Sequence, residues 1–123
     1  DTPLVGSDWI LRVQRVKRQD LPAGWAENTD AWRAYLDDVA VEKGLWLRTR
    51  RPGDRFQPLG MHARTVKLGD FLTNQKVPHP VRDRLPLLVT EQEILWVCGQ
   101  RLDDRASLRA TSESALVLEF LRH

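Results

Sequence analysis

The stretch that decides the fold reads LWLRTRRPGDRFQPLGM and runs from Leu45 to Met61. Its first half alternates between two sides, with Leu45, Leu47 and Thr49 on one and Trp46, Arg48 and Arg50 on the other. This alternation predicts a β-strand, because neighbouring side chains of a strand project to opposite faces. Pro52 and Gly53 predict a turn that ends the strand. We expect Arg48 and Arg50 to lie side by side, roughly 7 Å apart.

The segments on either side of this stretch predict further strands. Alternation with a period of two runs through DWILRVQRVKR, residues 8–18, and SALVLEFLRH, residues 114–123. The apolar runs in PLLVT and EQEILWVCG, which together cover residues 86–99, predict two strands joined by a tight turn. The segment AWRAYLDDVAVEKG, residues 31–44, is compatible with either a short helix or a strand.

Two short helices are predicted after the basic stretch. In TVKLGDFLTNQKV, residues 65–77, the apolar positions recur with a helical period, and Thr65 is the expected N-cap. PHPVRDRLP, residues 78–86, begins with prolines that suit the first turn of a helix and ends at Pro86. The fold class that follows is α+β, with mostly antiparallel strands and two short helices in the middle.

Length and composition are those of an ordinary globular domain. The 123 residues are 41% hydrophobic and 29% charged, which is sufficient for a hydrophobic core. No apolar run approaches the roughly 20 residues of a membrane span, so we expect no membrane partner. Cys98 is the single cysteine, which excludes an internal disulfide and fits a cytoplasmic location. The sequence begins without Met or a signal pattern, and we expect it to be a piece of a longer chain.

Positive charge is concentrated in the middle of the sequence. The net charge is only +2, but residues 43–84 carry ten basic and three acidic side chains, a balance of +7. Residues 19–42 carry one basic and six acidic side chains. A block of this kind indicates a surface for a polyanion, and the alternative is a solvated face without a ligand.

No familiar catalytic or metal-binding pattern occurs in the sequence. The histidines His62, His79 and His123 have no partners at metal-ligand spacing, and Cys98 stands alone as an expected buried side chain. Neither a nucleotide-binding glycine loop nor a G-x-S-x-G nucleophile is present. The acid pairs at 37–38 and 103–104 are expected to be solvated loop residues. We therefore expect no catalytic residue, no metal site and no cofactor within this sequence.

The basic block suits recognition of a nucleic-acid duplex through its phosphates. A guanidinium group donates two parallel hydrogen bonds that match a phosphate. Few rings accompany the cations, only Phe56, His62 and His79, so stacking on single strands is less favoured. Structural alternatives stay open for some cations, because Arg55 can pair with Asp54. Likewise, Arg82 and Arg84 flank Asp83, and Arg101 and Arg105 lie near Asp103 and Asp104.

Several motifs in series resemble the C-terminal domain of bacterial tRNA(Ile)-lysidine synthases. These motifs are LRTRRPGDRFQPLGM, KLGDFLTNQKVPHPVRDRLPLL and ILWVCGQRLDDRA, and the match extends from Leu45 to about Ala106. The resemblance implies a β/β/α layered fold that is also seen in the β subunit of phenylalanyl-tRNA synthetase. It implies that residues 45–123 form the tRNA-binding domain. Residues 1–44 are then an N-terminal strand and linker, either in the same domain or connecting to a preceding one.

The resemblance also implies a function for the longer protein. Enzymes of this family use ATP to adenylate the wobble cytidine of tRNA(Ile), and lysine then displaces AMP to give lysidine. That chemistry belongs to an N-terminal domain with an S-G-G-x-D-S loop, which this sequence lacks. ATP and lysine are thus expected to be used outside this fragment. The partners expected for the fragment are tRNA(Ile), at its acceptor stem, and its own N-terminal catalytic domain.

The motif positions and neighbouring cations give a candidate tRNA-binding set: Arg48, Arg50, Arg51, Arg55, Arg64, Lys67, Lys76, Arg82 and Arg101. Asp54 and Asp70 are expected to orient arginines or cap turns. The side chains expected to pack the first helix onto the sheet are Phe56, Leu59, Leu68, Phe71 and Leu72. The segment HARTVK departs from the family, which often has G-G-x-K-K before this helix.

A second hypothesis assigns the same arginines to a protein contact. In that hypothesis the chain is an interdomain scaffold without direct RNA contact, and its arginines pair with acids of the catalytic domain. The loop that holds Trp25 and Trp32 would form part of that interface.

Overall fold

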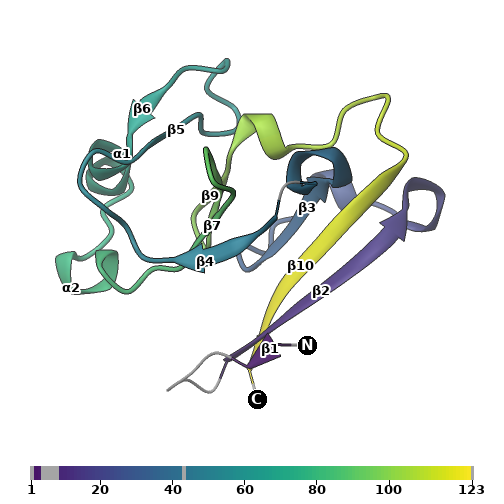
Figure 1. Ribbon diagram of the computed structural model, residues 1–123, viewed down its shortest axis with the longest axis horizontal. Helices are drawn as coiled ribbons and strands as arrows, with labels where there is room; N and C mark the ends of the chain where they lie inside the picture. Colours follow the sequence, from purple (N-terminus) through teal and green to yellow (C-terminus); the bar gives the residue numbers. More distant parts are fainter. Residues whose placement is uncertain (1, 4–8, 43, 123) are drawn as a thin grey trace.

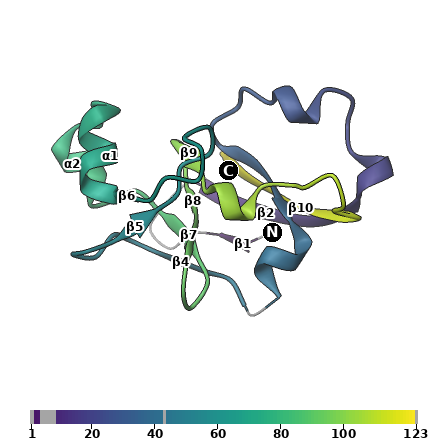
Figure 2. The same ribbon diagram turned by 90° about the horizontal axis from the view of Figure 1, so that it is seen from above.

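Two four-stranded antiparallel sheets, a two-stranded ribbon and one helical layer make up the fold, described over residues 2–3, 9–42 and 44–122 of the computed structural model. Figures 1 and 2 show the helices α1 (Leu68–Asn74) and α2 (His79–Arg82) at one end and the long strands β2 (Trp9–Lys17) and β10 (Ser114–Arg122) at the other. The second sheet lies between them. The α+β prediction with two helices in the middle is confirmed.

The first sheet joins the two ends of the chain. Its order is β1-β2-β10-β3, with β1 at Thr2–Pro3 and β3 at Arg33–Asp37, and every pair is antiparallel. Both long strands were predicted from their alternation, although residues 8 and 123 of the predicted ranges lie outside the described residues. The ambiguous segment 31–44 supplies β3, because β10 offers it a pairing edge from Ala115 to Glu119. A strand from the last ten residues thus shares a sheet with strands that precede residue 44.

The second sheet has the order β4-β7-β8-β9. Its strands are β4 (Trp46–Arg48), β7 (Leu87–Val89), β8 (Ile94–Val97) and β9 (Arg101–Leu102). The predicted hairpin within residues 86–99 is confirmed as β7 and β8. The strand predicted from Leu45 onward is shorter than expected and ends at Arg48, so the side-by-side arrangement of Arg48 and Arg50 on one strand is wrong.

Burial on both faces makes the second sheet the central layer. In β7, Leu88 packs into the core between the two sheets, while Leu87 and Val89 pack into a second core beneath the helices. All four residues of β8 are buried. A strand covered on both faces reads as a continuous apolar run, which explains the sequence ILWV. The result is the β/β/α layering that the resemblance implied.

A small ribbon leads into the first helix. Strands β5 (Arg55–Phe56) and β6 (Val66–Lys67) pair with each other, and α1 begins directly after β6 at Leu68. The predicted N-cap at Thr65 is therefore wrong, since Lys67 occupies the cap position in extended conformation. The N–H of Leu68 instead donates to the backbone carbonyl of Asp54 at 2.9 Å.

The helix packs as predicted, with one exception. Phe56, Leu68, Phe71 and Leu72 are buried, and the rings of Phe56 and Phe71 meet edge to face at 5.0 Å. Leu59 was expected in this core, but it lies on the surface with 39% of its area exposed. Short 3-10 helices lie in the connections: η1 (Arg18–Asp20), η2 (Trp25–Glu27), η3 (Asp38–Val41) and η4 (Asp104–Ala106). None of the helices in the described ranges is both long and apolar enough to cross a membrane.

Candidate nucleic-acid interface

Asp54 organises the turn at the centre of the basic block. Gly53 has a φ of +85°, a left-handed conformation that glycine adopts without strain. Both carboxylate oxygens of Asp54 accept hydrogen bonds from the terminal nitrogens of Arg48, each at 2.9 Å, and one also accepts from the N–H of Arg51 at 2.8 Å. Burial alone raises the pKa of Asp54, but these hydrogen bonds outweigh burial and hold the pKa below its ordinary value. The prediction that Asp54 orients an arginine is confirmed.

Arg48 is consequently a structural residue. Its guanidinium is bidentate on Asp54 and also donates to the carbonyl of Thr49 at 3.0 Å. The pair is mostly buried, with 22% of the Arg48 side chain and 12% of the Asp54 side chain exposed. Asp54 pairs with Arg48 rather than with its neighbour Arg55, the pairing that the sequence left open. Arg48 lines a cleft with Arg51 and Arg55, but its guanidinium is held by Asp54, so its predicted contact with tRNA is less favoured than theirs.

Arg50 links the turn to the second helix through a weaker pair. Its Nε donates to Asp83 at 2.8 Å, and the Asp83 side chain is 74% exposed. An exposed pair of this kind contributes little to stability, typically about 0–1 kcal/mol. No hydrogen bond within the described residues takes either terminal nitrogen of Arg50, so its fork is available to an anion.

The ribbon β5–β6 sets two cations opposite each other. Arg55 on β5 is the register partner of Lys67 on β6, and both side chains are exposed. Their neighbours Phe56 and Val66 form the next pair and face the helix core. Like charges directly opposite each other destabilise an antiparallel pair. Among the described residues no acid forms an ion pair with Arg55 or Lys67.

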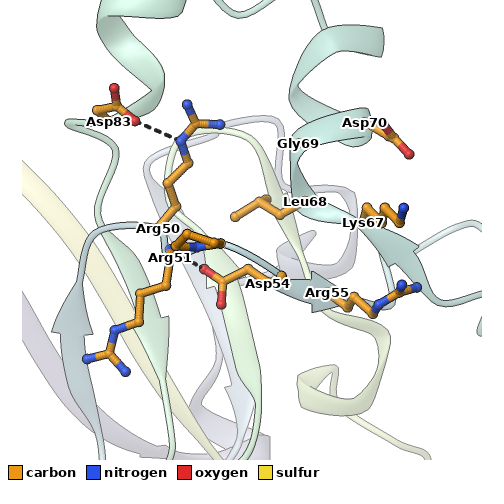
Figure 3. A pocket seen from close by; sticks show the side chains of 11 residues that line it. Arg50, Arg51, Asp54, Arg55, Lys67, Leu68, Gly69, Asp70 and Asp83 are labelled. Atoms are coloured by element: carbon orange, nitrogen blue, oxygen red, sulfur yellow. Dashed lines mark hydrogen bonds and ion pairs between the residues drawn. The ribbon is translucent and has the colours of Figure 1, made fainter.

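Three surface clefts meet at this ribbon and share Arg55. The first, drawn in Figure 3, lies between the turn and the start of α1 and is lined by Arg50, Arg51, Arg55 and Lys67. The second contains Arg55, Arg64 and Lys67, and the third contains Arg51 and Arg55. We call Arg50, Arg51, Arg55, Arg64 and Lys67 the basic surface. Asp70 lies on the Lys67 side of the first cleft, where the structure records no bond from it to an arginine of the described chain.

Arg82 belongs to the interior of the helix pair. Only 8% of it is exposed, its Nε donates to the carbonyl of Val77 at 2.7 Å, and one terminal nitrogen donates to the hydroxyl of Thr73 at 3.0 Å. Its recorded partners are thus not Asp83, and its burial leaves little of the side chain accessible to tRNA, so the predicted tRNA contact stays a prediction that this burial does not favour. Arg82 instead ties the end of α1 to α2.

Arg101 and Lys76 lie outside the basic surface. The Arg101 guanidinium sits 5.5 Å from the centre of the Phe71 ring and donates to the carbonyl of Leu59 at 3.2 Å, so it packs against the protein. Lys76 is exposed and ends α1 with a φ of +57°. Neither side chain lines the three clefts.

The acids at 103 and 104 differ from the sequence prediction. Asp103 is fully buried and accepts hydrogen bonds from the N–H of Gln57 and from the N–H and guanidinium of Arg105, at 2.8–3.0 Å. The hydrogen bonds to Asp103 raise the pKa of Arg105 despite partial burial. Asp103 is thus a structural junction between the β5 segment and η4, and not a solvated loop acid.

Binding of a metal ion requires several ligating side chains that lie close together. The described residues contain no group of three or more His, Cys, Asp or Glu side chains arranged to hold a metal ion. Cys98 is fully buried, as predicted, and burial raises the pKa of its thiol well above the ordinary value, which keeps it protonated. The chemistry available at the basic surface is therefore anion binding.

Comparison with known proteins identifies the family. The family model described as the TilS substrate C-terminal domain matches residues 45–119.

The chain belongs to this family.

Relatives of the chain carry the name tRNA(Ile)-lysidine synthase. The protein of Dehalococcoides mccartyi (strain CBDB1) is 37% identical over 119 residues, which is 94% of this chain and 25% of the relative. The protein of Symbiobacterium thermophilum is 44% identical over 82 residues, which is 67% of this chain and 17% of the relative. The chain thus spans about a quarter of the length of these relatives or less. The family resemblance predicted from the motifs is confirmed.

A solved structure supports the fold. A crystal structure described as the TILS C-terminal domain superposes with a TM-score of 0.74 at 22% identity, covering 94% of this chain and 85% of the other. At this identity the likeness establishes the layered fold of the TilS substrate C-terminal domain and nothing about individual contacts.

The loop before α1, where the family often has glycines, keeps a glycine-like backbone here. His62 and Ala63 have φ values of +53° and +59°, in the left-handed region that side chains with a Cβ rarely adopt. Each such residue costs of order 1 kcal/mol. The loop therefore carries backbone strain at these two residues.

Sequence reasoning missed one exposed aromatic residue beside the basic surface. Trp46 was assigned only to a face of the first predicted strand, yet 48% of it is exposed and it lines the same cleft as Arg51 and Arg55. The signal in the sequence was the spacing: Trp46 lies two residues before Arg48, and residues two apart on a strand share a face. Trp32, expected in an interface loop, instead stacks on Trp9 and packs against Phe120.

Proposed function

We propose that the chain is the tRNA-binding C-terminal domain of a tRNA(Ile)-lysidine synthase and that it grips the acceptor stem of tRNA(Ile). In the proposed whole enzyme, a separate N-terminal domain uses ATP and lysine to convert the wobble cytidine to lysidine, in the cytoplasm. Family membership, the names of the relatives and the basic surface support this proposal.

The observation that carries the proposal is the opposition of Arg55 and Lys67 across the ribbon. Like charges directly opposite each other cost stability in the free domain, and no carboxylate of the described chain forms an ion pair with either of them, although Asp70 lines two of the same clefts. A phosphate group bound between the two side chains removes that repulsion. The sharing of Arg55 by three clefts gives a phosphate backbone a continuous path across the domain.

The electrostatic footprint predicts a specific salt dependence. If each of the five cations of the basic surface contacts one phosphate, about five counterions are released on binding. Each neutralised phosphate contributes roughly 0.7–0.9 to the magnitude of the slope of log K against log salt, so five phosphates give a slope of about −4. Affinity then falls by more than a hundredfold between about 50 mM and 200 mM salt.

Fluorescence anisotropy with labelled tRNA(Ile) tests the proposal. We expect the isolated chain to bind with a slope of about −4, and Arg55→Ala to reduce the magnitude of that slope by about 0.7–0.9. Lys17→Ala is the matched control, because Lys17 is an exposed cation on β2 opposite Ser114 and lies outside the three clefts. Binding that ignores salt, or no binding at low salt, contradicts the proposal and leaves the interdomain scaffold as the better hypothesis.

A further inference from the structure

Trp46 is a large aromatic side chain held at the surface. It begins β4, the edge strand of the second sheet, and pairs there with Val89. With 48% of its area exposed, it is among the exposed large hydrophobic residues of the described chain. An indole that is partly exposed keeps part of its ring surface available for stacking on another planar group.

The backbone of Gly44 supports the Trp46 ring. Gly44 has a φ of +107°, and a Cβ added at this position would lie 2.9 Å from the Cη2 atom of the ring. The ring therefore packs closely over the α-carbon of Gly44, where only glycine fits. This contact restricts the indole while nearly half of the side chain stays open to solvent.

The open part of the indole faces a cleft that belongs to the basic surface. Trp46, Arg51 and Arg55 line this cleft together. Arg51 extends from the turn in the direction away from Arg50, as Figure 3 shows. The β7–β8 turn also lines this cleft and brings Glu91 and Glu93. Glu93 is paired with Arg105 at 3.5 Å, which reduces its repulsion of an incoming anion.

A restricted indole that shares a cleft with two arginines matches the chemistry of an unpaired nucleotide. Bases inside a duplex already stack on both faces, so only an unpaired or terminal base offers a free face to a side chain. The cations of the cleft can hold the phosphates on either side of such a base. The geometry points to Trp46 as a stacking platform for one nucleobase of an unpaired segment that adjoins an RNA duplex. This inference rests on the proposed function.

Binding of hairpin RNAs to the chain tests the platform. The probes are three labelled hairpins whose identical stem is closed by a non-nucleotide linker, so that an overhang is the only unpaired segment: one blunt, one with an unpaired 3′ overhang and one with an unpaired 5′ overhang. We expect Trp46→Ala to weaken binding of at least one overhang hairpin about fivefold or more, and to leave binding of the blunt hairpin unchanged. Trp46→Phe keeps a ring and is expected to retain most of the affinity.

Trp25→Ala is the matched control variant. Trp25 is also a partly exposed indole, but it lines a different cleft, beside Tyr35. We expect its loss to leave the affinity for all three hairpins unchanged. As a second readout, an overhang hairpin should quench the tryptophan fluorescence of the wild type more than that of Trp46→Phe.

The outcomes separate this inference from the proposed function. If the wild type binds none of the hairpins in a salt-dependent manner, both fail. If it binds them and Trp46→Ala weakens blunt and overhang hairpins equally, or none of them, the platform is overturned while the basic surface stands. An indole that contacts a protein segment instead of RNA gives this second result.

Discussion

Reversing the charge of Lys67 should stabilise the domain and weaken its binding to RNA at the same time. Lys67→Glu replaces the cation opposite Arg55 with a carboxylate, so a repulsive cross-strand pair becomes an attractive one. Side-chain charges on a directly opposed pair lie roughly 6–8 Å apart, which at the dielectric constant of water gives about 0.5–0.7 kcal/mol for each sign. Replacing the repulsion by an attraction should therefore raise the free energy of unfolding by about 1 kcal/mol at low salt.

Thermal unfolding followed by circular dichroism measures this gain. For a domain of this size about 1 kcal/mol corresponds to a rise in Tm of roughly 3–6 °C. The rise should shrink towards zero at about 1 M salt, where the Debye length is about 3 Å. Lys67→Gln removes the repulsion without adding an attraction and should give about half of the rise.

Lys17→Glu controls for the change in net charge. Lys17 faces Ser114 across β2 and β10, so its reversal relieves no cation pair and should leave Tm and RNA affinity nearly unchanged. Lys67→Glu should instead weaken tRNA binding by an order of magnitude at low salt, through the loss of one phosphate contact and the addition of a repulsive charge. If Lys67→Glu fails to raise Tm at low salt, Arg55 and Lys67 do not repel each other measurably. The argument that a bound phosphate relieves their repulsion is then refuted.

Further predictions concern single residues. Arg82→Ala should lower the free energy of unfolding, measured by urea titration, by about 2–3 kcal/mol, because two hydrogen bonds of a buried charge are lost. The slope of log K against log salt for RNA binding should stay unchanged. A smaller slope would show that Arg82 contacts a phosphate. In the same assay Asp103→Ala should lower the free energy of unfolding by about 2–4 kcal/mol, since it leaves the N–H of Gln57 and the Arg105 guanidinium unpaired. A decrease below about 1 kcal/mol would mean that Asp103 contributes little to stability. Asp54 has a lowered pKa in the folded state, so its contribution to stability is fully present above its unfolded pKa of about 4 and is lost as pH falls through the lowered value. Asp54→Asn should reduce the dependence of the free energy of unfolding on pH in that acidic range. An unchanged dependence would show that Asp54 does not have a lowered pKa in the folded state. Ala63→Gly should raise the free energy of unfolding by about 0.5–1 kcal/mol, because glycine adopts the φ of +59° without strain; a loss of stability would show that the loop is not strained.

The layered fold could be predicted because its strands and helices are marked locally. The alternation in β2 and β10 and the fully apolar β8 need only neighbouring residues to be recognised. The ribbon β5–β6 could not be predicted, because each strand has two residues and no periodicity. Because β6 takes Val66 and Lys67, α1 begins at Leu68, and its cap position is Lys67 instead of the expected Thr65.

By itself, the sequence determined the fold class, the family and the position of the basic block, since periodicity and motif order are properties of neighbouring residues. Only the tertiary structure decided which cations of that block are available. Arg48 forms an ion pair with Asp54, and Arg82 is buried between the two helices. Arg55 lies opposite Lys67 on the neighbouring strand. The physical reason is that the energy of a charge depends on what lies within a few ångströms of it in space. For Arg50 that neighbour is Asp83, thirty-three residues away along the chain.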